Sequence, residues 1–179
     1  MFDLTGRIAV VTGASAGLGR GEAIALARQG ADVAIIARRA EKLDEVAAEI
    51  RGLGRRCLPV VCDVTEPGQI ETAIGQIIAE YGKVDILVNN TGGGPSAPLE
   101  DISDEMFMYH VQLELMATFR FTRGFGKYML ERGYGRVINI ASILGLGGIG
   151  VPGEAKCIAY ESCKGAVLNF TRGAAVEWA

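Results

Sequence analysis

Metal-binding patterns are scarce in this sequence. It contains a single histidine, and its four cysteines form no Cys-x-x-Cys pair. A structural zinc site is therefore not expected, because such sites combine closely spaced cysteines and histidines. The sequence instead favours buried, reduced thiols in a cytoplasmic protein at Cys57, Cys62, Cys157 and Cys163.

Long apolar runs and an excess of one charge are also missing. No apolar run approaches the ~20 residues of a membrane span, and the first residues lack the apolar core of a signal peptide. The formal net charge is −3 and the arginines are scattered, which is not the footprint of a nucleic-acid-binding protein. We expect a soluble, cytoplasmic chain with no membrane or nucleic-acid partner.

Glycine is the residue in excess. It occupies 25 of 179 positions, about twice its average share of ~7%. The glycines show no three-residue period, so a collagen-like fold is excluded. They gather where apolar runs give way to helical patterns, which indicates tight turns and close backbone approaches.

Short apolar runs alternate with longer helical patterns along the whole chain. The expected strands are 7–12, 32–37, 57–61, 84–89 and 136–141. The expected helices are 19–29, 40–51, 66–81, 103–132 and 159–178. This alternation predicts an α/β fold: a Rossmann-like, doubly wound parallel sheet of five strands in a three-layer α/β/α arrangement. Residues 1–179 are expected to form a single nucleotide-binding domain.

A glycine-rich turn lies between the first expected strand and the first expected helix. Its sequence from Thr12 is Thr-Gly-Ala-Ser-Ala-Gly-Leu-Gly. Backbone amides of such a turn can approach a pyrophosphate, and the positive end of the following helix then faces the anion. In this context the turn predicts a dinucleotide site, with cofactor contacts at Gly13, Ser15, Gly17, Leu18 and Gly19.

The end of the second expected strand bears on the choice between NAD and NADP. An acidic residue there would bind the adenosine ribose hydroxyls and repel a 2′-phosphate. This chain has Ala37-Arg38-Arg39 instead, and Arg38 can form a forked contact with a phosphate. NADP(H) is therefore favoured over NAD(H), although a solvated arginine pair is the simpler alternative.

Three further segments follow the glycine-rich turn in order. They are Cys62-Asp63-Val64, Asn89-Asn90-Thr91-Gly92 and Tyr160-Glu161-Ser162-Cys163-Lys164. With the turn, they resemble the motifs of the short-chain dehydrogenase/reductase family, including its NAD(P)-dependent alcohol dehydrogenases and 3-oxoacyl reductases. The resemblance covers essentially the whole chain and implies cofactor contacts at Asp63, Val64, Asn90 and Gly92. Threonine replaces the alanine of the family's Asn-Asn-Ala-Gly motif.

The same resemblance implies the catalytic groups. Tyr160 would exchange a proton with a carbonyl or hydroxyl group while hydride moves to or from nicotinamide. Lys164 lies one turn later on the same helix face, where its ammonium would favour the phenolate and hold the nicotinamide ribose. Ser142 would hydrogen-bond the substrate oxygen. The spacing from Ser142 to Tyr160 is longer than in the family, which indicates a loop insertion at 144–156 beside the substrate pocket.

The family's fourth catalytic residue is an asparagine in the long helix, where it helps to hold a water molecule near the lysine. Alignment on Phe119 and Thr122 places Glu114 there, and a slip of one turn would place Gln112 there instead. A buried carboxylate would change the charge balance at Lys164. The alternative is that Glu114 faces solvent or a subunit interface and has no catalytic role.

Family members continue past the last expected helix, so the domain is expected to be incomplete at its C-terminus. The expected partner is a small-molecule carbonyl or alcohol substrate. Apolar residues on several faces of helices 103–132 and 159–178 indicate a homodimer or homotetramer. The principal hypothesis is an oxidoreductase acting on a secondary alcohol or ketone, such as a 3-oxoacyl thioester, sugar or polyol. A nucleotide-binding fold without catalysis is the alternative.

Overall fold

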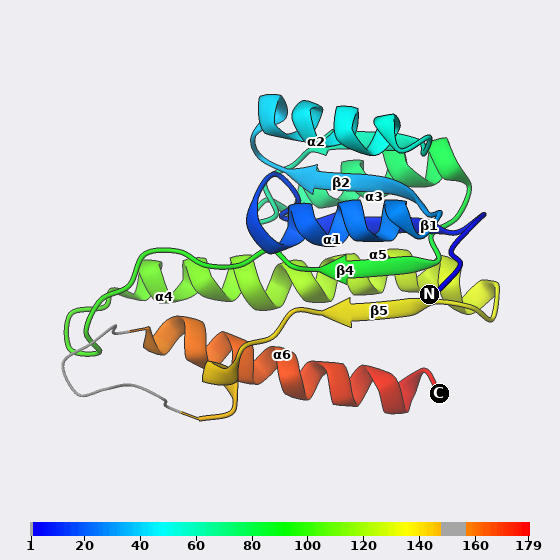
Figure 1. Ribbon diagram of the computed structural model, residues 1–179. Helices are drawn as coiled ribbons and strands as arrows, with labels where there is room; N and C mark the ends of the chain where they lie inside the picture. Colours follow the sequence, from blue (N-terminus) through cyan, green and yellow to red (C-terminus); the bar gives the residue numbers. More distant parts are fainter. Residues whose placement is uncertain (1, 148–156) are drawn as a thin grey trace.

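The computed structural model describes residues 2–147 and 157–179. Its centre is a five-stranded sheet in the order β3-β2-β1-β4-β5, and each neighbouring pair is parallel. The strands are β1 (Ile8–Thr12), β2 (Asp32–Ala37), β3 (Cys57–Val61), β4 (Ile86–Asn89) and β5 (Arg136–Asn139). The predicted Rossmann-like architecture is thus confirmed, with β5 at one edge of the sheet (Figure 1).

Helices cover both faces of the sheet (Figure 1). The helices α1 (Gly17–Arg28) and α2 (Ala40–Gly52) pack on one face. The other face carries α3 (Pro67–Tyr81), the run α4 (Asp104–His110), η1 (Val111–Met116) and α5 (Ala117–Glu131), and α6 (Ile158–Glu177), which packs on η1. In the described part of the chain, no helix combines the length and the apolar character needed to cross a membrane.

The strands alternate their side chains between two separate cores. Ala9 and Val11 of β1 face the core shared with α1 and α2, whereas Val10 faces the core shared with α3 and α5. All five side chains of β1 are buried, as expected for a central parallel strand covered on both faces. The sheet is therefore a rigid frame whose carboxyl-end loops can carry a site.

The long expected helix 103–132 is continuous but not α-helical throughout. It begins at Ser103, whose hydroxyl accepts a hydrogen bond from the amide of Met106 at 3.2 Å. Its middle segment, η1, is a π-helix that holds Glu114. Such segments are mostly single turns inside α-helices and are frequent at functional sites, and the sequence pattern did not predict this one.

Smaller departures from the expected elements lie at strand ends and in one thiol. β4 begins at Ile86 and β5 ends at Asn139, so each is two residues shorter than expected. Cys57, Cys62 and Cys163 are buried as expected, whereas Cys157 is only partly buried and its thiol donates to Glu161 Oε1 at 3.2 Å. Most of the expected insertion at 144–156 lies outside the described residues.

A buried carboxylate joins several elements at the amino end of the sheet. Asp85, immediately before β4, is completely buried and accepts a hydrogen bond from the backbone amide of Ile8 at 2.9 Å. Arg132 lies 2.7 Å from its carboxylate, Lys83 lies 2.9 Å away, and Arg7 lies 3.6 Å away. The cluster ties β1, β4 and the end of α5 together, opposite the end that holds the candidate site.

Candidate cofactor and active site

A pocket of about 630 Å³ opens at the carboxyl ends of the strands. This is where ligands bind in open parallel sheets, at the point where the strand order reverses between β1 and β4. Ten predicted site residues contribute to its lining: Gly13, Ser15, Leu18, Arg38, Asp63, Val64, Asn90, Gly92, Tyr160 and Lys164. The pocket therefore brings the predicted cofactor residues and two predicted catalytic residues into one space.

The glycine-rich turn needs its glycines for two physical reasons. Gly13 and Gly17 have φ of +68° and +58°, a region that side chains other than glycine rarely adopt. A Cβ on Gly13 would lie 2.8 Å from Nδ2 of Asn90, and a Cβ on Gly19 would lie 2.6 Å from the carbonyl oxygen of Gly13. Gly17 and Gly19 thus shape the turn without forming part of the described pocket lining.

The turn is tied directly to the loop after β4. Thr12 Oγ1 accepts hydrogen bonds from the amides of Asn90 at 3.0 Å and Thr91 at 3.1 Å. In return, Asn90 Nδ2 donates to the carbonyl oxygen of Thr12 at 3.0 Å. These reciprocal bonds hold the two loops at a fixed separation, which pre-forms the pocket between them.

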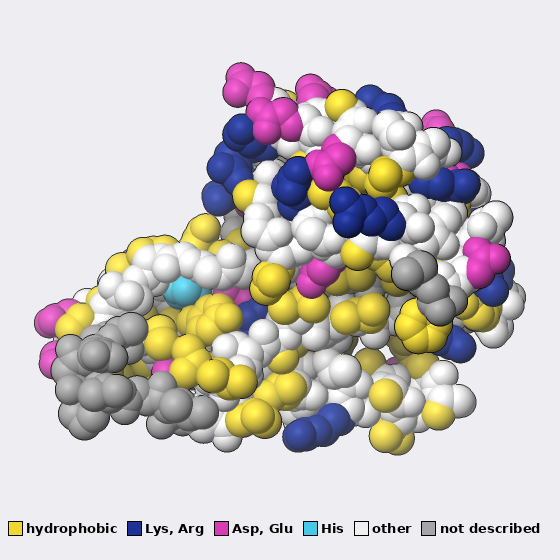
Figure 2. All heavy atoms as spheres, in the orientation of Figure 1, with side chains coloured by type: hydrophobic (Ala, Val, Ile, Leu, Met, Phe, Trp, Pro, Cys, Tyr) yellow, Lys and Arg dark blue, Asp and Glu magenta, His cyan; other side chains and the backbone are white. Residues whose placement is uncertain are grey.

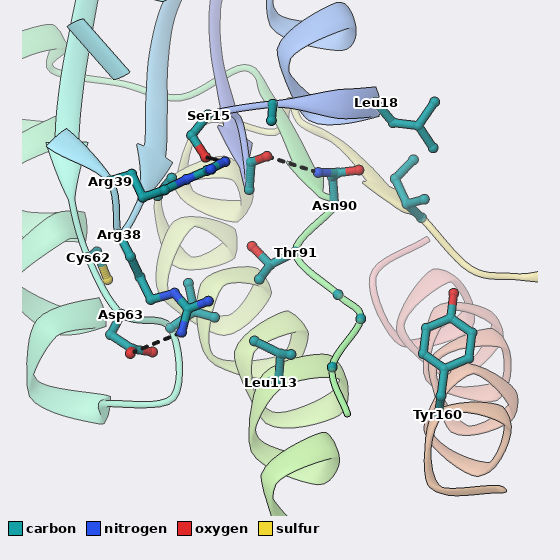
Figure 3. A pocket seen from close by; sticks show the side chains of 18 of the residues that line it. Ser15, Leu18, Arg38, Arg39, Cys62, Asp63, Asn90, Thr91, Leu113 and Tyr160 are labelled. Atoms are coloured by element: carbon teal, nitrogen blue, oxygen red, sulfur yellow. Dashed lines mark hydrogen bonds and ion pairs between the residues drawn. The ribbon is translucent and has the colours of Figure 1, made fainter. Parts of the chain in front are cut away.

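Two arginines follow β2 and point toward different partners (Figure 3). Arg38 Nη1 lies 3.9 Å from Asp63 Oδ2, and the Arg38 side chain is exposed whereas that of Asp63 is half-buried. Arg39 donates from Nη2 to Ser15 Oγ at 3.0 Å. Sequence reasoning singled out Arg38 alone, but Arg39 lines the same pocket and reaches the glycine-rich turn. The repeated cation after β2 was the available signal for it.

Tyr160 and Lys164 project from the first turns of α6 into the pocket. Figure 3 shows the Tyr160 hydroxyl directed away from α6, and both residues line the pocket. Lys164 Nζ lies 5.6 Å from the centre of the Tyr160 ring and donates to the carbonyl oxygen of Ile140 at 2.7 Å. The ammonium is thus fixed between the tyrosine and the end of β5, in an almost fully buried position.

Glu114 reaches Lys164 from the π-helical segment. Its Oε2 lies 2.8 Å from Lys164 Nζ, and its Oε1 accepts a hydrogen bond from the amide of Gly93 at 2.6 Å. A Cβ on Gly92 would lie 2.7 Å from Glu114 Oε2, so glycine leaves room for the carboxylate. Gln112 instead accepts from Arg120 at 2.9 Å. Of the two candidates left open by the sequence, the structure brings Glu114 to the lysine.

Ser142 lies just outside the pocket lining formed by the described residues. It caps the short 3-10 turn η2 (Ile143–Gly145), and its Oγ accepts from the amide of Leu144 at 3.2 Å. A Cβ on Gly145 would lie 2.7 Å from the carbonyl carbon of Lys164. This close approach seats η2 on α6 and fixes Ser142 relative to the Tyr160–Lys164 helix.

Comparison with known proteins gives a consistent result. The family model for short chain dehydrogenases matches residues 7–179. Gluconate 5-dehydrogenase of Gluconobacter oxydans is 35% identical over 178 residues, which cover 99% of this chain and 68% of that protein. The chain belongs to the short-chain dehydrogenase family of oxidoreductases.

Solved structures of the family superpose closely on this short-chain dehydrogenase. L-sorbose reductase from Gluconobacter frateurii, in complex with NADPH and L-sorbose, has a TM-score of 0.92 at 31% identity, with 98% of this chain and 65% of that chain covered. NAD⁺-bound xylitol dehydrogenase has a TM-score of 0.90 at 29% identity, with 98% and 66% covered. The chain spans about two thirds of the length of these relatives.

The residues present fit the nicotinamide dinucleotide that the family binds. Gly13 and Gly19 leave no room for side chains against Asn90, so the turn stays closely packed at the start of α1, where backbone amides and the helix dipole favour a pyrophosphate. Arg38, Arg39 and Asp63 surround one end of the pocket, and Tyr160 lies at the other, with Lys164 beside it. The arginines and Asp63 therefore suit the adenosine end of such a cofactor, and the tyrosine and lysine suit its nicotinamide end.

Proposed function

We propose that this protein is an NAD(P)(H)-dependent oxidoreductase that interconverts a secondary alcohol and a ketone. The observation that carries the proposal is that Tyr160 and Lys164 share one pocket with the glycine-rich turn. A bound nicotinamide would accept or supply the hydride. Because all five strands belong to one sheet, we also assign residues 1–179 to a single nucleotide-binding domain.

Each residue has a distinct role in this proposal. The Tyr160 hydroxyl donates a proton to the carbonyl oxygen during reduction and accepts it during oxidation. Lys164, fixed by the Ile140 carbonyl, presents its charge to the phenol and to a ribose. Ser142, held by η2 against α6, orients the substrate oxygen and stabilises its developing negative charge.

The substrate class follows from the relatives only in broad terms. Relatives named for gluconate, xylitol and L-sorbose point to sugar acids, polyols and ketoses, and 3-oxoacyl thioesters are a further class to include. A panel of these compounds, followed by NADPH absorbance, tests the proposal. Tight cofactor binding without turnover of any compound would favour a nucleotide-binding fold without catalysis, an alternative that the replacement of asparagine by Glu114 supports.

The cofactor preference is expected to be for NADP(H). Arg38 and Arg39 both follow β2, and the chain has no acid there to repel a 2′-phosphate. We expect NADPH to bind at least about tenfold more tightly than NADH, and Arg38→Ala to remove most of that difference. Titration of cofactor fluorescence measures both values. The exposed Arg28, at the end of α1, provides the matched control Arg28→Ala. Equal affinities in the unmodified protein would refute the preference.

Homodimers or homotetramers are expected through the helical runs 103–132 and 159–178. The side chains of Phe107, Leu115, Phe119 and Phe170 stay partly exposed, whereas Leu113, Phe121 and Phe125 fill the core. Figure 2 shows hydrophobic side chains gathered over the half of the molecule that holds α4 and α6. A self-complementary patch of this kind suits a two-fold interface. Light scattering at micromolar concentration should give at least a dimer, and a monomer alone would contradict the proposal.

The compartment proposed for the protein is the cytoplasm. Cys57, Cys62 and Cys163 are buried free thiols, and burial raises the pKa of the Cys57 thiol to about 12 and that of Cys62 to about 11. Thiols of this kind are inert structural residues, and they are consistent with a reducing environment.

A further inference from the structure

The charge of Glu114 bears on the direction in which this site works. We propose that Glu114 is a positioning residue that neutralises Lys164, keeps Tyr160 in its protonated form near neutral pH, and thereby favours carbonyl reduction over alcohol oxidation. The inference rests on the proposed function, because it concerns the same tyrosine and lysine.

The contact between Glu114 and Lys164 is direct and buried. The two side chains are 0% and 5% exposed, and the atoms Oε2 and Nζ are 2.8 Å apart. That separation leaves no space for a water molecule between them, in contrast to a water-mediated contact through an asparagine. Glu114 Oε1 is anchored by the amide of Gly93, and Lys164 Nζ by the carbonyl oxygen of Ile140. Both charges are therefore held in place.

A paired ammonium influences the phenol less than a free one. Lys164 Nζ lies 5.6 Å from the centre of the Tyr160 ring, which is twice its distance from Glu114 Oε2. The opposite charge of the carboxylate therefore offsets part of the attraction that an isolated ammonium exerts on a phenolate. The pair thus weakens the main protein-derived force that would draw the proton from Tyr160.

The other ionisable groups around the pair do not replace the lost positive charge. Burial raises the pKa of the Cys163 thiol to about 11, so the thiol is neutral near pH 7. His110 is buried with Nε2 2.8 Å from the carbonyl oxygen of Pro95, and Tyr109 lines the pocket. Glu161, next to Tyr160, is a further carboxylate, and Arg38 and Asp63 lie at the far end of the pocket.

The consequence is a directional preference. Reduction of a carbonyl requires Tyr160 to donate a proton, whereas oxidation of an alcohol requires the phenolate to accept one. A site that retains the protonated phenol is ready for reduction near pH 7. Oxidation at such a site requires a higher pH than reduction does.

The test compares the isosteric variant Glu114→Gln with the unmodified protein and with Glu131→Gln, a matched control at the exposed end of α5. The first readout is the pH dependence of oxidation and of reduction. The second is the ultraviolet absorbance of phenolate, taken as the difference between each protein and its Tyr160→Phe counterpart, which requires no substrate. We expect the midpoints of the pH profiles and of the phenolate absorbance change to fall by about one pH unit or more in Glu114→Gln. The same midpoints should stay unchanged in Glu131→Gln.

The outcomes separate this inference from the proposed function. An unchanged or higher midpoint in Glu114→Gln, with turnover present, overturns the role of Glu114 and leaves the oxidoreductase intact. Absence of turnover in the unmodified protein refutes the proposed function, while the absorbance measurement still tests the pair. If Glu114→Gln fails to fold, Glu114→Asn provides the same charge change. If neither variant folds, the pH profile of the unmodified protein provides the test. An oxidation rate that has already reached its plateau at neutral pH overturns the inference. An oxidation rate that continues to rise toward alkaline pH supports it.

Discussion

Replacement of Tyr160 by phenylalanine should lower kcat by about 10²-fold or more. The ring and its packing on α6 are retained, but the hydroxyl that projects into the pocket is lost. Cofactor affinity should change little, because the glycine-rich turn and the arginines after β2 are untouched. Steady-state kinetics combined with a cofactor titration measure the two quantities separately. A variant with near-normal kcat would remove Tyr160 from the chemical step.

Two further substitutions provide contrasting signatures. Lys164→Ala should damage both turnover and cofactor binding, because the ammonium serves the phenol and a ribose, and it also leaves Glu114 buried without its ion-pair partner. Ser142→Ala should lower turnover while cofactor affinity stays near normal. General destabilisation would instead lower all parameters together with the melting temperature.

Removal of the Asp85 carboxylate should have the largest effect on stability. We expect Asp85→Ala to lower the free energy of unfolding by about 3 kcal/mol, because it leaves three cations and the Ile8 amide without their shared acceptor. For a chain of this size that corresponds to a fall in Tm of about 6–12 °C. This loss lies at the lower end of the range for buried ion pairs, because the three cations remain partly exposed. Asp44→Ala, on the exposed face of α2, is the matched control, and equal Tm values in the two variants would contradict the account.

The contribution of the Asp85 carboxylate to the free energy of unfolding should fall at low pH. Burial raises the pKa of the Asp85 carboxyl, but hydrogen bonds from Arg132, the Ile8 amide and Lys83 outweigh it and bring that pKa below its usual range. The stabilisation is therefore fully present above the ordinary aspartate value of about 3.9. It is lost as the pH falls through the lowered value. The difference in stability between the unmodified protein and Asp85→Ala should be constant from about pH 5 to 8 and shrink below about pH 4.

The fold could be predicted because its signals are local and repeated. Buried parallel strands such as β1 and β2 are short apolar runs, and α2 shows a clear apolar face at Leu43, Val46, Ala47 and Ile50. The ends of the strands were predicted less accurately. Val84 is apolar and buried, yet it precedes β4, because pairing with β1 begins only at Ile86.

The candidate site was predictable where residue type alone decides the chemistry. Glycines after a strand, cations after β2 and the tyrosine–lysine pair on one helix can all be read from spacing. The partner of Lys164 could not be, because the choice between Gln112 and Glu114 depends on the π-helical register of η1. The segment packs against α6, and such tertiary contacts are not encoded in a local pattern. The contact of Arg39 with Ser15 likewise depends on tertiary geometry.

The most direct test of the central claim follows the hydride itself. The purified protein is supplied with NADPH that carries deuterium at the transferable position of the nicotinamide, together with a ketone that it reduces, and the product is analysed by mass spectrometry. The account predicts one deuterium on the new alcohol carbon of each product molecule, and a loss of this labelled product in Tyr160→Phe. Oxidation of the cofactor without labelled alcohol, or equal labelled product from Tyr160→Phe, would contradict the assignment of this pocket as a hydride-transfer site.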